Sequence, residues 1–516
     1  MSQLLSSNSR IAKNSFMLYV RMFFAMAVGF YTSRIVLFVL GQQDFGIYSL
    51  VGGLISLLAF LNNTMSGATS RFLTFELGKG EEGKLKSVFD TVFLLHSAIA
   101  LVVFVVAEVL GIWFVSTLNI PPDRMWAAQW VFQAVVFSMI VSIIQVPFMA
   151  SVISHEKMGV YAYFEIIGIG LRLAIVLCLN YITADKLIAY AFLLVAVSVI
   201  VFLLYLFYCH RCFPETKGSK SFDKSISKKL MSFFGLNLFG NFGSLFNDQA
   251  LNVLVNLFFG LVYNAATGVA STVSNYVASF SLNTQMAYRP PIIKAYAIGD
   301  FDKMQVLMDQ GLKMTVFLFA LFAIPVIVET DTIVALWLKE VPPAAGLFCR
   351  FMIINLMVTT IRQFFIIGIH ATGRVKYVSL SIGVLFTINP FFIWVALRNY
   401  KIISIVYSGT IIVNIITLII VFLLLKRFIK ELKLLPIALA VAKMLTVALL
   451  VCIAVFFFSK SMHPGLLRLV FSSLLSTSLL SVGIFLFCLS PIQRKSVIIK
   501  AKQWLSFKQN RLSDMS

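Results

Sequence analysis

The sequence predicts an all-α integral membrane protein of about fourteen transmembrane helices, with two parallel six-helix repeats around a central cavity and two extra C-terminal helices. Three observations lead to this prediction. The 516-residue chain is 60% hydrophobic and 12% charged, with a mean hydropathy of +0.94, which exceeds the apolar share of soluble domains. Apolar runs long enough to cross a bilayer follow one another with short connections. The first half of the chain also aligns with the second.

Each apolar run of about 20 residues or more is predicted to form one membrane-spanning helix. The first run is too long for the hydrophobic region of a signal peptide, so we expect it to stay in the protein as a helix. The predicted spans are residues 15–40, 46–75, 88–118, 126–152, 158–182, 187–210, 230–259, 264–294, 305–336, 346–371, 376–397, 402–425, 435–458 and 465–489.

Basic residues are concentrated on one side of these spans. If the N-terminus is cytoplasmic, roughly 27 Lys and Arg lie in inside segments and roughly 6 in outside segments. This bias accounts for the formal net charge of +21. The basic residues do not form a groove interleaved with aromatic side chains, so we expect no nucleic-acid partner. We expect a multi-pass protein with both termini in the cytoplasm.

Three short turns of the first half align with three turns of the second half at an offset of about 217–219 residues. The aligned positions are Gly41 with Gly260, Gly80 with Gly299, and His155-Glu156-Lys157 with Thr372-Gly373-Arg374. Each half then contains six helices, and an even number makes the halves parallel, with a cavity between them.

This alignment divides the chain into five segments. The predicted segments are an N-terminal half at 1–210, a basic cytoplasmic linker at 211–229, a C-terminal half at 230–428, two additional transmembrane helices at 429–490 and a basic tail at 491–516. The tail has apolar residues at helical spacing with basic residues beside them. We expect it to form an amphipathic helix that binds membrane lipids at the cytoplasmic surface.

The apolar span at 230–259 carries a stripe of polar side chains on one helical face. Unpaired polar groups cost several kcal/mol each in hydrocarbon, so this face must meet protein or water. We predict that it lines an internal cavity, with Asp248 near mid-membrane as a candidate functional group. A seam of interhelical hydrogen bonds is the alternative. The stripe consists of Asn237, Asn241, Ser244, Asp248, Asn252 and Asn256.

A second signal follows the first predicted helix, which begins near Asn14-Ser15. The stretch Leu40-Gly41-Gln42-Gln43-Asp44-Phe45-Gly46-Ile47-Tyr48-Ser49-Leu50-Val51 resembles the first-loop signature of bacterial polysaccharide flippases. These are the Wzx-type O-antigen and capsule translocases of the multidrug/oligosaccharidyl-lipid/polysaccharide exporter (MOP) superfamily. Pro147 and the turn His155-Glu156-Lys157-Met158 are similar to the connection between the fourth and fifth helices of that family.

The resemblance implies a V-shaped transporter in the bacterial inner membrane. Such a protein flips an undecaprenyl-pyrophosphate-linked oligosaccharide by alternating access, for lipopolysaccharide (O-antigen), capsule or exopolysaccharide biosynthesis. We expect such a transporter to act together with other polysaccharide-assembly proteins and to need no cofactor.

A lipid-linked oligosaccharide with a pyrophosphate needs cationic groups for the phosphates and hydrogen-bonding groups for the sugars. Arginine suits phosphate because its fork donates two parallel hydrogen bonds and stays charged when buried. The candidate substrate-binding arginines are Arg172, Arg362, Arg21 and Arg34, and the candidate sugar contacts on the next helix are Asn275, Asn283 and Gln285. Pairing with a carboxylate, snorkelling to the interface and interhelical hydrogen bonds are the structural alternatives.

Asp248 and Glu165 are the candidates for ion coupling. A carboxyl group in a low-dielectric site resists ionisation, so its protonation can respond to a proton gradient. With amide oxygens nearby, the same group can instead hold a sodium ion.

Two other functions share parts of this pattern. A cation-coupled multidrug exporter of the same superfamily would share the architecture, but the first helix has Arg21 and Arg34 and no acid to meet cationic drugs. A membrane enzyme of polysaccharide assembly would need a nucleophile, an acid–base pair or a metal centre. The sequence has neither paired external carboxylates nor a His/Cys cluster with metal-ligand spacing. We therefore expect a transporter without a metal, and not an enzyme.

Overall fold

The computed structural model describes residues 2–117, 120–217, 221–338, 341–488 and 494. These residues form thirteen α-helices and three short 3-10 turns, with no β-strand among them. The α-helices are α1 (Ser2–Lys79), α2 (Glu82–Thr117), α3 (Met125–Ser154), α4 (Met158–Cys178), α5 (Lys186–Cys212), α6 (Lys224–Phe259), α7 (Leu261–Ala297), α8 (Phe301–Trp337), α9 (Ala345–Thr372), α10 (Lys376–Tyr400), α11 (Ser404–Phe428), α12 (Leu434–Lys460) and α13 (Leu466–Phe487). The predicted amphipathic tail lies outside the described residues except for Arg494.

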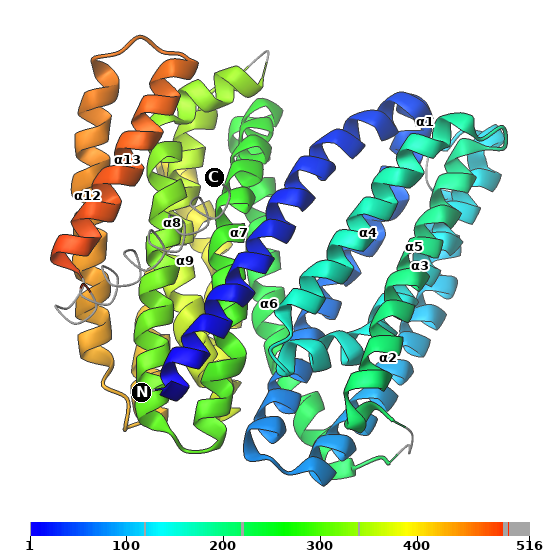
Figure 1. Ribbon diagram of the computed structural model, residues 1–516. Helices are drawn as coiled ribbons and strands as arrows, with labels where there is room; N and C mark the ends of the chain where they lie inside the picture. The colour runs from blue at the N-terminus through cyan, green and yellow to red at the C-terminus, as the bar shows by residue number, and fades with distance from the viewer. Residues whose placement is uncertain (1, 118–119, 218–220, 339–340, 489–493, 495–516) are drawn as a thin grey trace, which may run out of the picture.

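The first two predicted spans form one continuous element, α1. Gly41 interrupts it with φ 76° and ψ 171°, and the helix reverses its direction there (Figure 1). With α1 counted twice, the helices agree with the predicted fourteen spans. Within the described part of the chain, ten helical segments are long and apolar enough to cross a membrane, by length and composition alone. Of the remaining helices, α6 carries the predicted polar stripe, which lowers its hydropathy.

The aligned turns of the two halves have matching backbone conformations. Positive φ values are readily adopted only by glycine, so they rarely coincide by chance. The pairs are Gly41 and Gly260 (φ 76° and 87°), Gly80 and Gly299 (73° and 76°), and Glu156 and Gly373 (60° and 75°). The agreement supports the predicted repeat, whereas the exact bounds of the two halves stay a prediction.

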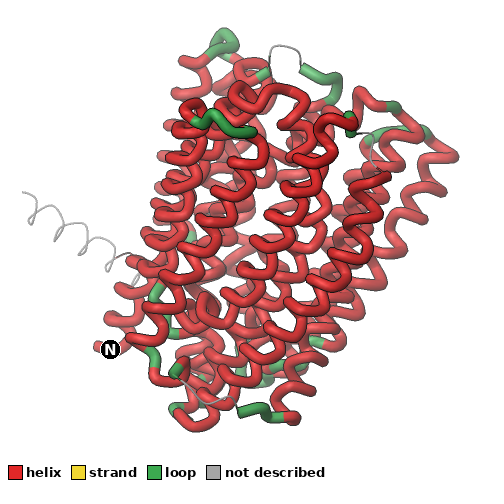
Figure 2. Tube along the Cα trace, turned by 90° about the vertical axis from the view of Figure 1, so that its right-hand side faces the viewer, coloured by secondary structure: helices red, strands yellow, loops and turns green. Residues whose placement is uncertain are grey.

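The helices form two bundles (Figure 1). The first bundle contains α1–α5, and the second contains α6–α11, with α12 and α13 packed against α8. The N-terminal part of α1 crosses between the bundles and makes the most extensive contact with the second bundle, against α7. Figure 2 shows the helices running roughly parallel, with the loops gathered at the two ends.

The bundles are joined at one end, which we call the basic end because it carries the turns around Gly80, Glu156, Gly299 and Gly373 and many of the predicted inside Lys and Arg. There, Leu18 and Met158 of the first bundle share one apolar core with Ile292 and other residues of the second. At the opposite end each bundle has its own core, around Leu179 in the first and Phe348 in the second. The molecule therefore has the expected V shape, closed at the basic end.

Close packing between α6 and α10 depends on two glycines. A Cβ on Gly243 would lie 2.6 Å from the carbonyl oxygen of Gly383 and 2.7 Å from its Cα. Backbone atoms cannot rotate away, so the helices would have to separate. The face of α6 that carries Gly243 therefore packs on α10, and the polar stripe lies on another face of the same helix.

We expect Gly243→Ala to lower the stability of the protein by about 1–3 kcal/mol, the usual effect of overpacking. Gly235→Ala is the matched control on the same helix, because no heavy atom lies within 4 Å of the added Cβ, and alanine favours a helix by up to about 1 kcal/mol. The thermal midpoint of the detergent-solubilised protein measures both. Equal midpoints for the two variants would contradict the packing described.

A buried ion pair attaches α13 to α8. Glu329 is fully buried, and Arg468 donates hydrogen bonds from Nε and Nη2 to its Oε2 at 3.0 and 2.8 Å. Thr332 and Ser472 donate further hydrogen bonds to the carboxylate at 2.9 and 3.1 Å. The backbone of α8 leaves helical geometry at Glu329, with φ −100° and ψ 18°. Neither member of the pair is among the sequence-predicted candidates.

Candidate functional site

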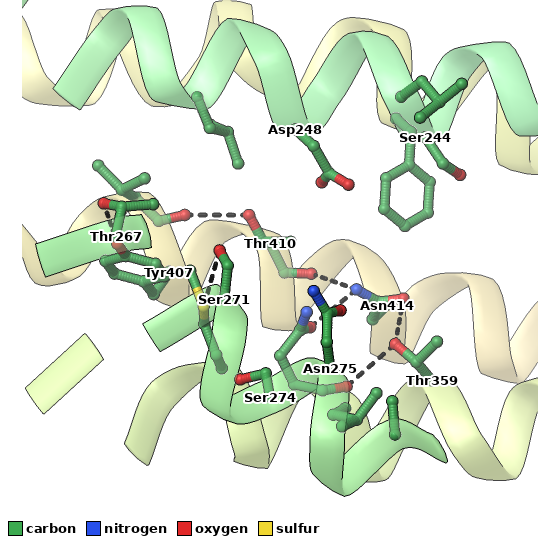
Figure 3. A pocket seen from close by; sticks show the side chains of 18 of the residues that line it. Ser244, Asp248, Thr267, Ser271, Ser274, Asn275, Thr359, Tyr407, Thr410 and Asn414 are labelled. Atoms are coloured by element: carbon green, nitrogen blue, oxygen red, sulfur yellow. Dashed lines mark hydrogen bonds between the residues drawn. The ribbon is translucent and has the colours of Figure 1, made fainter. Parts of the chain in front are cut away.

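A cavity of about 590 Å³ lies inside the second bundle, and we call it the polar cavity. Its size is typical of small-molecule sites. Figure 3 shows polar side chains of several helices pointing into it. Its polar lining consists of Asn241, Ser244, Asp248 and Asn252 of α6, Thr267, Ser271, Ser274 and Asn275 of α7, Asn355, Thr359, Arg362 and Gln363 of α9, and Tyr407, Thr410 and Asn414 of α11.

Four of the six stripe residues on α6 line the polar cavity. Asn237 instead donates a hydrogen bond to the carbonyl of Phe233 at 2.8 Å, and Asn256 is not part of the lining. Asn241 also donates to Oγ1 of Thr64 on α1 at 2.8 Å. The stripe therefore begins at the junction of the bundles and continues into the second one.

Two further stripes, which the sequence reasoning missed, face the one on α6. Asn355, Thr359 and Arg362 lie at i, i+4 and i+7 on α9, and the same spacing relates Thr410, Asn414 and Thr417 on α11. The amide of Asn414 donates to Oδ1 of Asn355 at 2.8 Å, and Thr359 donates to Oδ1 of Asn414 at 3.3 Å. Their helical period is visible in the sequence and would have identified both helices as cavity walls.

Arg362 places a positive charge in the wall of the polar cavity. The residue is 4% exposed, and its Nη1 donates to Oγ1 of Thr417 at 2.9 Å. The guanidinium lies 5.3 Å from the centre of the Phe386 ring, and its Nε has no hydrogen-bond partner. Among the side chains that the structure describes, no carboxylate pairs with it. A buried charge without a counterion is unfavourable, and an anion in the cavity would complete the arrangement.

Asp248 brings a carboxylate to the same cavity from α6 (Figure 3). Its Oδ1 accepts a hydrogen bond from the side-chain amide of Asn247 at 3.3 Å. Within the described part of the chain it forms no ion pair, with Arg362 or with any other cation. The cavity therefore contains one acidic and one basic group that remain available to a solute or an ion.

Arg21 lies between the bundles instead of in the polar cavity. Its Nη1 donates to the hydroxyl of Tyr161 on α4 at 2.8 Å, and its Nη2 donates to Oδ1 of Asn283 on α7 at 3.3 Å. Asn283 and Gln285 are buried and donate to backbone carbonyls, Gln285 to that of Thr360 at 3.4 Å. Of the three candidate sugar contacts, Asn275 alone lines the cavity.

The remaining candidates are not brought to the polar cavity. Arg172 is exposed on α4, and it is close enough to Tyr48 and Tyr190 to interact with their hydroxyls electrostatically. Glu165 is partly buried on α4, where Arg21 supplies a nearby positive charge. The two ion-coupling candidates therefore lie in different bundles. The side chain of Arg34 lies outside the described residues.

Asp44, from the stretch that carries the family resemblance, belongs to a charged cluster at the end opposite the basic end. Arg124 donates to both carboxylate oxygens of Asp44, from Nε to Oδ1 at 2.8 Å, and from Nη1 to Oδ2 of Asp185 at 2.6 Å. Asp185 also caps α5 by accepting from the backbone N–H of Leu187 and Ile188. Burial alone would raise the pKa of Asp185, but the bonds from Arg124 and the helix N–H groups hold it below its usual value. The cluster ties three segments of the first bundle together.

No protein-family model and no curated protein sequence matches the chain. Solved structures do match in fold. A MATE transporter in a bent conformation has a TM-score of 0.70 at 13% identity, over 83% of this chain and 96% of that one. A multidrug resistance MATE family transporter of the MOP superfamily, in an outward-facing conformation, has a TM-score of 0.66 at 14% identity, over 82% and 97%.

A third similar structure is a MOP superfamily transporter from Pyrococcus furiosus, with a TM-score of 0.65 at 13% identity over 82% of this chain and 97% of that one. The reverse polarity of the binding pocket of that transporter suggests a different function for it. At this level of identity the likeness concerns the fold. The chain is therefore a multi-pass membrane protein whose fold is like that of the MATE transporter structures.

Proposed function

We propose that the protein transports a polar, negatively charged solute through the polar cavity by alternating access, and that this solute is an undecaprenyl-pyrophosphate-linked oligosaccharide. The observation that carries the proposal is Arg362, a buried guanidinium beside the cavity without a carboxylate partner among the described side chains. Guanidinium groups bind phosphate oxygens in a bidentate manner. The amides of Asn252, Asn275 and Asn355 would donate to and accept from sugar hydroxyls.

The conformation supports an alternating-access cycle. The charge bias predicts that the basic end is cytoplasmic, so the bundles are joined on the cytoplasmic side. Their contacts there include the ion pair of Lys294 with Glu156 at 2.8 Å and the hydrogen bond between Tyr19 and Thr284 at 2.5 Å. Loading from the cytoplasm requires these contacts to open, while the polar lining of the second bundle is retained.

A second candidate is a cation-coupled multidrug exporter. Two observations favour it: the fold likeness to MATE transporters, one of them described as a multidrug resistance protein, and the carboxylate of Asp248 in the polar cavity, which forms no ion pair with a described residue. The Pyrococcus furiosus structure, with its pocket of reversed polarity, is a reason to decide between the candidates by cavity chemistry.

Transbilayer movement in proteoliposomes separates the two candidates. We expect the parent protein to move a fluorescent undecaprenyl-pyrophosphate oligosaccharide, and we expect Asp248→Asn to retain movement but lose its dependence on a proton or sodium gradient. Asn241→Asp is the matched reverse substitution, in which an amide on the same helix face is replaced by a carboxylate. If the parent protein exports an organic cation and does not move the lipid-linked sugar, the flippase proposal is refuted and the multidrug exporter is supported.

A further inference from the structure

A second cavity of about 590 Å³ lies at the basic end, and it shares no lining residue with the polar cavity. It is bounded by α1, by the N-terminal part of α6 and by the turn between α9 and α10. Among the described residues that line it are four cationic side chains and neither Asp nor Glu: the four are Arg71, Lys228, Lys229 and Arg374. Glu76 interacts electrostatically with Arg71 from outside this lining. We call it the basic pocket.

Arg71 reaches from the first bundle to the C-terminal end of α9. It is 7% exposed, and its Nε and Nη2 donate to the carbonyls of His370 and Ala371 at 3.0 and 3.1 Å. A cation at a helix C-terminus is favoured by the unpaired carbonyls. The side chain passes so close to Gly373 that a Cβ there would lie 2.7 Å from Nη2. Two of its five N–H groups are used in these bonds, and the residue lines the pocket.

The other three cations come from the second bundle. Lys228 and Lys229 lie on the same face of α6 as Ser225 and Ser232, both of which line the pocket. Arg374 lies 5.8 Å from the centre of the Phe428 ring. No ion pair is formed by these three side chains within the described part of the chain. Like charges gathered in one pocket repel one another, and an anion between them reverses the sign of that interaction.

The backbone at the start of α10 also favours an anion in the basic pocket. The first turn of α10 begins beside the pocket, with Val375 as the N-cap and no side-chain cap. The N–H groups of an uncapped first turn favour an anion. A group with several acceptor oxygens, such as a phosphate, can therefore accept hydrogen bonds from side chains and backbone together.

We propose that the basic pocket binds a phosphate-bearing anion, and that this anion holds the two bundles together at the basic end. The pocket requires Arg71 from one bundle and Lys228, Lys229 and Arg374 from the other, so it is complete only while the bundles meet there. A ligand with higher affinity for one conformation shifts the population toward it. The anion is either a lipid head group of the cytoplasmic leaflet or a soluble phosphate. The proposal does not depend on which solute the polar cavity carries.

The test uses the purified full-length chain and two probes. The first probe is inorganic pyrophosphate. The second is phosphatidylglycerol in nanodiscs, which are compared with nanodiscs of phosphatidylcholine only. The test variant is Lys228→Gln/Lys229→Gln/Arg374→Gln. The matched control is Lys426→Gln/Arg427→Gln/Lys430→Gln, which removes three exposed cations from the same end but outside the pocket. We expect at least one probe to raise the thermal midpoint of the parent and the control by several degrees, and not that of the test variant. The probe that acts identifies the source of the anion.

A cross-linking measurement then separates binding from bundle closure. An ideal Cβ on Gly78 of α1 lies 3.0 Å from Cβ of Ala297 and 3.1 Å from Cα of Lys294 on α7. A separation of the two helices by about 0.5 Å brings the two Cβ atoms into the disulfide range. Gly78→Cys/Ala297→Cys, in a chain without the six native cysteines, therefore reports contact at the basic end. We expect the active probe to increase the rate of disulfide formation at least twofold, and to have no effect when the three pocket cations are replaced. The proposal is overturned if neither probe stabilises the parent, if the test variant responds like the control, or if the probe leaves the rate of disulfide formation unchanged.

Discussion

Arg362→Ala is expected to reduce transport of an undecaprenyl-pyrophosphate oligosaccharide by about 10- to 100-fold. A hydrogen bond to a charged group contributes about 1.5–3 kcal/mol, and each 1.4 kcal/mol corresponds to about tenfold in affinity. The substitution removes the positive charge whose Nε and cavity-facing side are free to meet a phosphate. Arg362→Lys keeps the charge but loses the planar fork, so we expect an intermediate rate. The initial rate of transbilayer movement in proteoliposomes measures these differences.

Arg172→Ala is the matched control, because this mid-helix arginine is exposed on α4 and does not line the polar cavity. We expect it to move the lipid-linked sugar at the parent rate. The thermal midpoint of Arg362→Ala should equal or exceed that of the parent, since an unpaired buried charge has been removed. An unchanged rate in a folded Arg362→Ala would refute the role of this residue in binding the substrate.

Glu329→Ala is expected to destabilise the protein by about 3–5 kcal/mol, the usual effect of leaving one member of a buried ion pair without its partner. Arg468 would remain with 16% of its side chain exposed and no carboxylate to accept its bonds. The same loss is expected for Arg468→Ala, which leaves the carboxyl group of Glu329 without its partner in a fully buried site. Denaturation of the purified protein, followed by circular dichroism, measures both.

The double variant Glu329→Leu/Arg468→Met distinguishes the ion pair from simple packing. Apolar residues of similar volume can replace a buried pair with little loss of stability. We therefore expect the double variant to be more stable than either matched single variant, Glu329→Leu or Arg468→Met, with a coupling free energy of about 1–3 kcal/mol between the two positions. Additive losses would mean that the two residues contribute independently, and that α13 is held to α8 by its apolar contacts alone.

The sequence was sufficient to predict the arrangement of helices. Length, composition and charge bias are properties of each segment alone, so the spans could be read without knowing what packs beside them. The positive-φ turns at Gly41 and Gly260 support the alignment that predicted the repeat. The stripe on α6 was visible for the same reason, because a helical period belongs to one segment.

The direction in which each helix faces was not predictable in the same way. Arg172 and Arg362 both lie well inside apolar helices, yet one is exposed and the other is 4% exposed beside a cavity. The difference arises from the neighbours of α4 and α9, which are distant in sequence. Likewise, the contact of Gly243 with Gly383 and the ion pair of Glu329 with Arg468 each join positions about 140 residues apart. A local pattern contains no information about such partners.

The matching turns also bear on how such a chain could have arisen. A half with an even number of membrane crossings returns to the side from which it started, so two copies of one gene product would insert in the same orientation and could associate side by side. Tandem duplication of that gene then needs only a linker on one side of the membrane, and no inversion of topology. Glu156 has the left-handed backbone that Gly373 has at the aligned position of the other half, and its carboxylate accepts a hydrogen bond from Lys294. At these turns the two halves therefore share a backbone conformation and differ in their side chains, as the duplication route would require.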